Sequence, residues 1–411
     1  MLGYSGSMTS SLRNLTVEDA RARILAGASR LGVETVALPD SLGRVLAEPV
    51  VAGRAQPPFD ASAMDGWAIR RADYGPGKAF AVAGESAAGK AYPRAVQAGE
   101  AVRIFTGAPV PEGADLVILQ EEAVRDGQTV RFEAGEAPKS NIRPAGGDFR
   151  AGDVLLEAGV VIDPWRLSLA ASAGLSRVPV ARRPRVAILA TGDELVPPGA
   201  APRPDQIFES GSFALAALIE AWGGEAVRLE ARGDDAAAIA AAVAPVEADL
   251  IVTIGGASVG DHDLVKPALE TLGLALAVET VALRPGKPTW SGTLADGRRV
   301  LGLPGNPASA LVCAELFLRP LLAALAGAEA EVRLTPARLA LSLPATGPRE
   351  HWMRATLSVD DEGRLVAQAF PDQDSSLVWV FSRADALLRR PTGAPAAQAG
   401  DVVKVLPLRR G

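Results

Sequence analysis

The feature that most constrains the fold is a regular alternation of short apolar runs and longer segments between residues 185 and 326. The apolar runs are continuous, as in strands buried on both faces, and they lie at residues 185–190, 226–230, 250–254 and 300–303. The longer segments have the length and apolar spacing of helices, and they lie at residues 212–222, 235–246, 263–272 and 308–326. The alternation predicts a parallel α/β domain of about 150 residues.

Two other regions have different sequence patterns. Between residues 56 and 148, short apolar runs are separated by Gly and Pro clusters, which predicts a small all-β unit. Helical patterns at residues 17–31 and 164–173 flank this unit, and we therefore expect it to be an inserted domain. After residue 327, short alternating segments with turn residues predict a closing β-barrel or sandwich.

Composition limits the classes of function. The 411 residues exceed one compact core, and the net charge of −6 disfavours a nucleic-acid binder. A single cysteine, Cys313, and two histidines argue against a disulfide framework and against thiolate or multi-histidine metal sites. Residues 1–11 lack the features of a signal peptide, and the apolar stretch at residues 311–327 falls short of a clean membrane span. We therefore expect a cytoplasmic protein that binds neither membrane nor nucleic acid.

Polar, glycine-rich loops follow the predicted strands. Ligands of an open parallel sheet bind beyond the carboxyl ends of its strands, so five such loops on one rim predict a binding site. They are Thr191-Gly192-Asp193-Glu194, Gly233-Asp234-Asp235, residues 255–263, Arg284-Pro285-Gly286-Lys287-Pro288 and Pro304-Gly305-Asn306-Pro307-Ala308-Ser309.

The loops carry two kinds of group. Backbone N–H groups at Gly255-Gly256 and Pro304-Gly305-Asn306 are candidates to hold a phosphate or oxyanion, and the side chains that add donors are Arg284, Lys287 and Ser309. Carboxylates suit Mg²⁺, and they are supplied by Glu194, Asp234 and Asp263. Together the two sets predict a phosphorylated substrate with a divalent metal ion.

Each of these residues also has a structural interpretation. Asp235 and Asp263 precede helices and are equally suited to cap them. The glycines can simply supply positive φ in turns, and Lys287 can be a solvated surface lysine. His262 is more readily a surface or cap residue than a ligand. The tryptophans that we expect in the core rather than in stacking roles are Trp165, Trp222 and Trp290.

The predicted inserted unit has motifs of its own. Residues 57–68 read PPFDASAMDGWA, and residues 103–109 and 141–148 read RIFTGAP and NIRPAGGD. They are either turn-rich loops of a small β domain or the wall of a site, and their density of acids, hydroxyls and glycines favours a site wall.

These motifs, followed by LATGDEL, TIGGASVGDHD, RPGKP and LPGNPASA, resemble the molybdopterin molybdenumtransferase family, whose members include bacterial MoeA and the E domain of gephyrin and its plant counterpart. The resemblance runs in order from about residue 15 to the C-terminus. It implies an elongated helical domain at residues 12–54 and 149–181, an inserted β domain at 55–148, a MogA-like α/β domain at 182–328 and a C-terminal β-barrel domain at 329–411.

The resemblance also implies an activity. Molybdate is inserted into adenylated molybdopterin, with Mg²⁺ or a similar divalent cation, and AMP and molybdenum cofactor are released. Each active site lies between the α/β domain of one subunit and the inserted domain of the other, so the implied state is a homodimer. The molybdopterin adenylyltransferase is a further implied partner. Molybdate and tungstate share shape and charge, and the sequence does not distinguish between them.

The resemblance assigns roles by position. The implied catalytic residues are Asp65, Thr106, Asp148 and Asp234, and the implied metal ligands are Glu194, Asp234 and Asp263. The implied molybdate pocket consists of Arg284, Lys287, Ser309, Arg354 and Ser375, and the cofactor-binding set is completed by Gly255, Gly256, Ser258 and Pro304.

The chain departs from the family pattern in three places. Arg284 stands where Lys is usual, which keeps the charge but changes the donor geometry. Glu209-Ser210-Gly211-Ser212 replaces the usual Asp-Ser/Thr-Asn, and residues 374–379 replace a loop richer in Gly and Ser.

Three other functions are compatible with parts of the pattern. A molybdopterin adenylyltransferase consists essentially of the α/β domain, and a nucleotide-processing enzyme of the CinA type shares that module. Neither needs the AMDGWA segment or the extra β domains. A gephyrin-like scaffold would need no catalysis at all.

Overall fold

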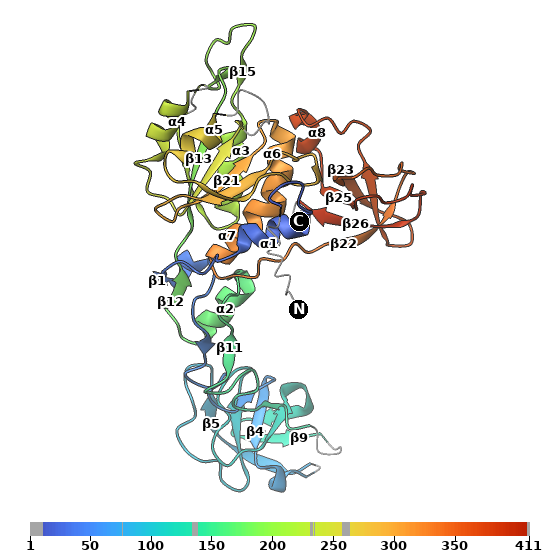
Figure 1. Ribbon diagram of the computed structural model, residues 1–411. Helices are drawn as coiled ribbons and strands as arrows, with labels where there is room; N and C mark the ends of the chain where they lie inside the picture. Colours follow the sequence, from blue (N-terminus) through green and yellow to red (C-terminus); the bar gives the residue numbers. More distant parts are fainter. Residues whose placement is uncertain are drawn as a thin grey trace, which may run out of the picture.

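The computed structural model describes residues 11–75, 77–133, 139–230, 233, 235–256 and 264–408. The molecule is elongated (Figure 1). A β unit lies at one end, the α/β domain and a barrel lie side by side at the other end, and a narrow waist joins them.

The β unit is a six-stranded sheet with strand order β7-β4-β6-β5-β9-β8. Its neighbours are antiparallel except for the parallel pair β5 and β6. Apolar side chains pack on both faces, with Trp67 in one cluster and Ala68 in the other. The strands are β4 (Gly66–Ile69), β5 (Ala79–Ser86), β6 (Glu100–Ile104), β7 (Leu116–Leu119), β8 (Ala123–Asp126) and β9 (Thr129–Phe132), with the pair β3 (Ala61–Ser62) and β10 (Ile142–Arg143) and the 3-10 turns η2 (Arg71–Asp73) and η3 (Gln120–Glu122). The predicted all-β unit is confirmed.

The waist contains less helix than the sequence predicted. Its elements are β1 (Val33–Ala37), η1 (Leu38–Ser41), β2 (Val50–Val51), β11 (Val154–Leu156), α2 (Pro164–Ser172) and β12 (Arg177–Ala181), with antiparallel pairs β1–β12 and β2–β11. Helix α1 (Val17–Leu25) ends earlier than predicted and packs into the core of the α/β domain. Trp165 contradicts its core interpretation, because it is 82% exposed on α2.

The α/β domain has the predicted strands but a mixed sheet. The order is β16-β13-β17-β21-β20-β18. The first four strands are parallel, and they are β16 (Glu225–Arg228), β13 (Arg185–Ala190), β17 (Leu250–Ile254) and β21 (Arg299–Leu303). The sequence analysis did not assign the last two strands, β20 (Trp290–Thr293) and β18 (Ala275–Val278), which are antiparallel to their neighbours. Two apolar clusters cover the two faces of the sheet.

This topology corrects the position of one predicted loop. The RPGKP segment does not leave a parallel strand of the sheet. It follows β19 (Leu283–Arg284), which pairs with a strand of the C-terminal barrel, and it leads into the antiparallel strand β20. Trp290 at the start of β20 pairs with Gly302 near the carboxyl end of β21, so the loop still reaches the predicted rim.

The helices of this domain cover both faces of the sheet. They are α3 (Gly211–Ala221), α4 (Ala236–Val243), α5 (Val265–Glu270), α6 (Pro307–Cys313) and α7 (Arg319–Leu325), and a short ribbon pairs β14 (Leu195–Val196) with β15 (Ile207–Phe208). A π-helical turn at Ala314–Leu318 joins α6 to α7. The continuous span Pro307–Leu325 begins earlier than the apolar stretch in the sequence and is long and apolar enough to cross a membrane, but 78% of its apolar window is buried in the molecule, as in a core helix.

The C-terminal strands close into a five-stranded barrel. Pairing runs β23-β24-β22-β26-β25 and returns from β25 to β23, and β19 adds to the outside of β23. The elements are β22 (Thr335–Leu339), β23 (Glu350–Val359), β24 (Leu365–Ala369), the short helix α8 (Val378–Ser382), β25 (Ala386–Arg390) and β26 (Val402–Pro407). Trp352 on β23 packs into the α/β core, so the barrel is fixed against the rim-bearing domain.

Candidate active site

Glycine brings three of the predicted loops together at the rim of the α/β sheet. Gly255 follows β17 with φ +92°, and a Cβ there would lie 2.5 Å from the carbonyl oxygen of Thr191. A Cβ on Gly305 would lie 3.3 Å from Cα of Gly255. The loops after β13, β17 and β21 therefore pack backbone against backbone, and only glycine fits at Gly255.

The same geometry corrects one predicted role. The N–H of Gly255 donates to the carbonyl of Leu303 at 3.2 Å. This bond continues the β17–β21 pairing, so the Gly255 N–H is not the free anion donor that the sequence analysis expected. Gly256 has φ +57°, and a Cβ there would lie 2.1 Å from Cγ2 of Val265. Position 256 therefore requires glycine, because α5 approaches the backbone there too closely for a side chain.

The loop that opens α6 is docked against the barrel. Pro304 and Ser309 are buried on either side of the loop. The side-chain amide of Asn306 donates to the Ser375 hydroxyl at 2.9 Å, and the N–H of Ala308 donates to the Ser375 carbonyl at 3.0 Å. Ser309 and Ser375 are thus brought to one place, as predicted, whereas the sequence analysis did not single out Asn306 as the linking residue.

The RPGKP turn is closed at both ends by hydrogen bonds. The N–H of Val281 donates to the carbonyl of Lys287 at 2.9 Å, and both the N–H and the hydroxyl of Thr289 donate to the carbonyl of Gly286 at 3.1 and 2.8 Å. The side chains of Arg284 and Lys287 are exposed. Two cationic groups therefore project from a well-anchored turn at the rim.

Arg354 is a buried cation with an unused donor. The side chain on β23 is fully buried, and its Nη1 and Nε donate to the carbonyl of Asp374 at 2.8 Å and to Oε1 of Gln373 at 3.2 Å. Its Nη2 has no hydrogen-bond partner among the described residues. Burial lowers the pKa of Arg354, and the nearby carboxylates of Asp372 and Asp374 oppose that shift. A buried donor without a partner is costly, and a bound oxyanion would satisfy it.

His351 adds a neutral group that the sequence analysis did not place at the site. It pairs with Arg284 across β23 and β19. Burial, together with the smaller effect of the charges of Arg284, Arg354 and Arg349, lowers the pKa of His351 to about 4. The imidazole is therefore neutral at pH 7, and this cluster keeps its positive charge on arginine.

The unusual Glu209 has a defined structural role. Its buried carboxylate accepts hydrogen bonds from the N–H of Ser212 at 2.7 Å and from the Ser212 hydroxyl at 2.6 Å. Arg228 donates to the Ser212 hydroxyl at 2.7 Å and lies 3.5 Å from the Glu209 carboxylate. The Arg228 guanidinium also stacks 3.3 Å from the Phe213 ring centroid. This network holds the first turn of α3 at the rim.

The predicted metal ligands are only partly described. Glu194 is exposed on the rim, and its carboxylate folds back over Gly192, where a Cβ would lie 2.5 Å from it. Asp234, Asp263 and Ser258 lie outside the described residues, as does His262. Within the described ranges no group of three or more His, Cys, Asp or Glu side chains is arranged to hold a metal ion.

Asp235 caps a helix, as one of its two interpretations predicted. Its carboxylate accepts hydrogen bonds from the N–H groups of Ala237 and Ala238 at 2.9 and 3.2 Å, at the start of α4. The residue therefore supports the rim loop rather than presenting a free carboxylate.

Asp65 and Thr106, which the resemblance assigns to the same catalytic set, meet in the β unit. Oδ1 of Asp65 accepts hydrogen bonds from the N–H of Thr106 at 2.7 Å and from its hydroxyl at 2.8 Å. The backbone bond, then the hydroxyl bond, lowers the pKa of Asp65. Asp65, Thr106 and Asp148 are all exposed, so this half of the candidate site presents ionised carboxylate to solvent.

The two halves of the candidate site lie at opposite ends of the chain. The β unit with Asp65 is separated from the α/β rim by the length of the waist (Figure 1). A single subunit therefore does not bring Asp65 to Lys287.

Three family models together match almost the whole chain, and two of them describe MoeA. "MoeA N-terminal region (domain I and II)" covers residues 15–174, "Probable molybdopterin binding domain" covers 187–324, and "MoeA C-terminal region (domain IV)" covers 336–408. The chain belongs to the MoeA family. Relatives in that family match at full length. A protein named molybdopterin molybdenumtransferase 2 from Mycobacterium tuberculosis is 37% identical over 90% of this chain and 94% of its own length.

Two further relatives support the MoeA assignment. A molybdopterin molybdenumtransferase from Haemophilus influenzae is 34% identical over 96% of this chain and 98% of its own length. The solved structure of a molybdopterin biosynthesis MoeA protein from Pyrococcus horikoshii OT3 superposes with a TM-score of 0.82 at 26% identity, and the match covers 96% of this chain and 99% of that one.

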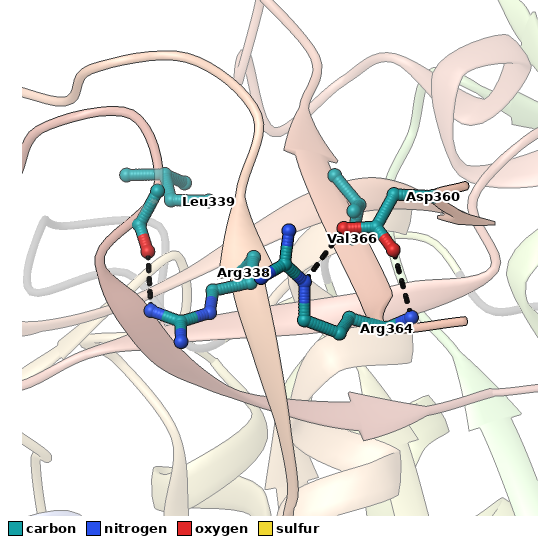
Figure 2. Close-up of a pocket in the computed structure, with 6 residues that line it drawn as sticks. Arg338, Leu339, Asp360, Arg364 and Val366 are labelled. Carbon is teal, nitrogen blue, oxygen red and sulfur yellow. Dashed lines mark hydrogen bonds and ion pairs between the residues drawn. The ribbon is translucent and has the colours of Figure 1, made fainter. Parts of the chain in front are cut away.

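A pocket in the barrel of this MoeA-family chain holds none of the predicted site residues. It has a volume of about 390 Å³ and lies over β22 and β24 (Figure 2). Its arginines are already engaged, because Arg364 pairs with Asp360 at 2.9 Å and Arg338 donates to the carbonyl of Gly400 at 2.9 Å. The pocket is a surface feature of the barrel and adds nothing to the candidate site.

Proposed function

We propose that the chain is a molybdopterin molybdenumtransferase that inserts molybdate into adenylated molybdopterin. Water cleaves the phosphoanhydride bond, so that AMP leaves and the molybdopterin phosphate remains. The two dithiolene thiols bind molybdenum, and their protons leave with one molybdate oxygen as water. The observation that carries this proposal is the set of anion donors around the start of α6 in a chain of the MoeA family.

The donors fit a dianionic oxyanion. Arg284 and Lys287 project from a closed turn, the buried Arg354 has one donor to spare, and Ser309 and Ser375 flank them on the docked loops. Charge-assisted hydrogen bonds of this kind are about twice as strong as neutral ones. We assign molybdate to this pocket.

We propose that carboxylates hold a divalent cation beside the phosphoanhydride. Oxygen ligands suit Mg²⁺, and Glu194 is exposed on the rim. We propose Asp234 and Asp263 as the other ligands, with Asp65 and Asp148 approaching from a second subunit. When bound, Mg²⁺ would neutralise phosphate charge. The protein residues would orient the anhydride, and the hydrogen bonds from Thr106 favour the ionised form of Asp65 by lowering its pKa.

A homodimer would join the two halves of the site. The β unit of one chain lies far from its own rim (Figure 1), so we propose that it reaches the rim of its partner. The waist also exposes apolar side chains, which a second copy would cover: Leu42, Val51, Val154, Val161 and Trp165. We also propose that the chain divides into four domains, at residues 12–54 with 149–181, 55–148, 182–328 and 329–411.

Product analysis tests the function. The purified chain is incubated with adenylated molybdopterin, molybdate and Mg²⁺, and both AMP and cofactor able to activate an apo-molybdoenzyme are measured. We expect molybdate-dependent formation of both products. A molybdopterin adenylyltransferase would instead use ATP and free molybdopterin and release pyrophosphate, and a scaffold would release neither product. Repeating the assay with tungstate distinguishes the two metals.

A further inference from the structure

One arginine outside the predicted site links the supports of Asp65. The carboxylate of Asp65 is held by Thr106 at the end of β6. The backbone on both sides of the Asp65–Gly66 peptide is held as well. The N–H of Gln120 donates to the Asp65 carbonyl at 3.1 Å, and Nη1 of Arg103 donates to the Gly66 carbonyl at 3.0 Å. The position of the carboxylate is therefore fixed by three neighbouring segments.

The guanidinium of Arg103 links Gly66 to Gln120, whose own N–H holds the Asp65 carbonyl. Nη2 of Arg103 donates to Oε1 of Gln120 at 2.6 Å, so Arg103 joins the loop after β7 to the start of β4. Arg103 also lies on β6, three residues before Thr106. Movement of this one side chain would loosen both the backbone of Asp65 and the segment that binds its carboxylate.

Aromatic rings hold the guanidinium in place. Its central carbon lies 4.8 Å from the Phe105 ring centroid and 5.6 Å from that of Trp67, which is the cross-strand partner of Arg103. A planar guanidinium can stack and donate to two acceptors at fixed angles, whereas a lysine ammonium cannot do both. The arrangement is therefore specific for arginine.

A close backbone contact with β7 restrains the start of β4. A Cβ on Gly66 would lie 1.8 Å from the carbonyl oxygen of Ile118 on β7. Because β4 and β7 are pressed together at Gly66, the Asp65 peptide cannot shift toward β7, and Arg103 closes the opposite side.

We infer that Arg103 is a positioning residue that fixes Asp65 and Thr106 in the geometry the transfer reaction needs. The inference rests on the proposed role of Asp65 in the MoeA-type reaction. We place Arg103 in support of Asp65 rather than in molybdate binding, because its two terminal nitrogens donate to Gly66 and Gln120 within its own β unit. Its loss should impair turnover and spare molybdate affinity.

Kinetics on the full-length protein test this assignment. We expect Arg103→Met and Arg103→Lys each to lower kcat for AMP release about ten- to hundred-fold, as a misplaced catalytic group does, with KM for molybdate changed by less than about two-fold. Arg125→Met is the matched control. Arg125 also lies over Trp67, at 5.8 Å, but its Nε donates only to Gly127 in its own turn, so this variant should keep the parent kcat.

The pH profile separates positioning from simple stability. The bonds from Thr106 lower the pKa of Asp65, and the charge of Arg103 adds to this effect. When the loop relaxes, the pKa of Asp65 rises towards its ordinary value, so the acid limb of kcat in Arg103→Met should move to higher pH. If Arg103 only stabilised the fold, its replacement would lower the melting temperature and leave the acid limb of the kcat profile in place.

Two further variants, Gln120→Met and Asp65→Asn, test the inference even if Arg103→Met fails to fold. Gln120→Met removes one acceptor of Arg103 from an exposed position, and it should give a smaller loss of kcat with the same direction of pH shift, even if Arg103→Met fails to fold. If the Arg103 and Gln120 variants keep the parent kcat and pH profile while Asp65→Asn is inactive, the positioning role of Arg103 is wrong and the assignment of Asp65 stands. An active Asp65→Asn would overturn the assignment of Asp65 and this inference with it.

Discussion

The backbone of Gly286 lies directly against the sulfur of Cys313, so that a Cβ on Gly286 would be 2.4 Å from Sγ. Gly286 has φ +120°, which disfavours any side chain as well. Helix α6, which ends at Cys313, therefore packs against the RPGKP turn. Packing and hydrogen bonds fix this turn, and the exposed side chain of Lys287 projects from it.

Lys287→Ala should cripple molybdate insertion and leave the fold intact. A charge-assisted hydrogen bond contributes roughly 1.5–3 kcal/mol, so its loss should raise the molybdate KM about ten- to hundred-fold. High molybdate should partly restore activity. Lys404→Ala, an exposed charge-matched change on β26, should have no effect. Unchanged turnover of Lys287→Ala at limiting molybdate would remove Lys287 from the pocket.

Arg354→Met should separate binding from stability. Methionine keeps most of the side-chain volume but donates no hydrogen bond to the Asp374 carbonyl or to Oε1 of Gln373, and we expect the free energy of unfolding to fall by about 1–3 kcal/mol. Molybdate should raise the melting temperature of the parent protein, because ligand binding stabilises the folded state. The variant should lose this rise. If it keeps the full molybdate-dependent shift, Arg354 does not contact the oxyanion.

Glu209→Ala should destabilise the first turn of α3. The change leaves the buried N–H and hydroxyl of Ser212 without their acceptor, at a cost of about 1–3 kcal/mol in the free energy of unfolding. Glu209→Asp, which restores the residue usual in the family, should lose part of this energy because the shorter side chain cannot reach both Ser212 and Arg228. Urea denaturation measures both. Equal stability of all three proteins would show that the network is not a support of the rim.

Alkaline pH should weaken the fold through Cys313. Burial raises the pKa of this thiol to about 12, although the hydrogen bond from Thr289 opposes the shift. Below the ordinary pKa of 9.0 the thiol is protonated in both states. Between 9.0 and about 12 only the unfolded chain loses the proton, so the free energy of unfolding should fall as pH rises. Cys313→Ala should lack this component, and identical slopes for the two proteins across that range would contradict the burial of the thiol.

Local sequence patterns predicted the parallel strands well, for a physical reason. Strands β13 and β17 are covered on both faces, so nearly all of their side chains are apolar, and the predicted bounds, residues 185–190 and 250–254, agree with the structure. Strand β20 (Trp290–Thr293) contains small and polar residues, and its pattern does not distinguish it from a loop. The pairing of β19 with β23 joins segments far apart in the chain, which no local pattern encodes.

The site was predictable as a set of motifs but not as an arrangement. The resemblance assigned Asp65 and Thr106 to one catalytic set, and the pairing of β4 with β6 brings them together. The burial of Arg354 could not be read from the sequence, since a charged residue in an alternating strand is usually solvated. The capping network of Glu209 depends on Arg228, which β16 supplies from a neighbouring strand.

Mixed dimers test most directly the claim that two subunits share each active site. Asp65→Asn and Lys287→Ala should each have little activity alone at limiting molybdate. When equal amounts of the two are unfolded together and refolded, random pairing places an intact Asp65 opposite an intact Lys287 in about a quarter of all sites. We predict that molybdate-dependent AMP release returns to about a quarter of the parent value. If the mixture stays as inactive as its components although mixed dimers have formed, the site lies within one chain and the shared-site account is wrong.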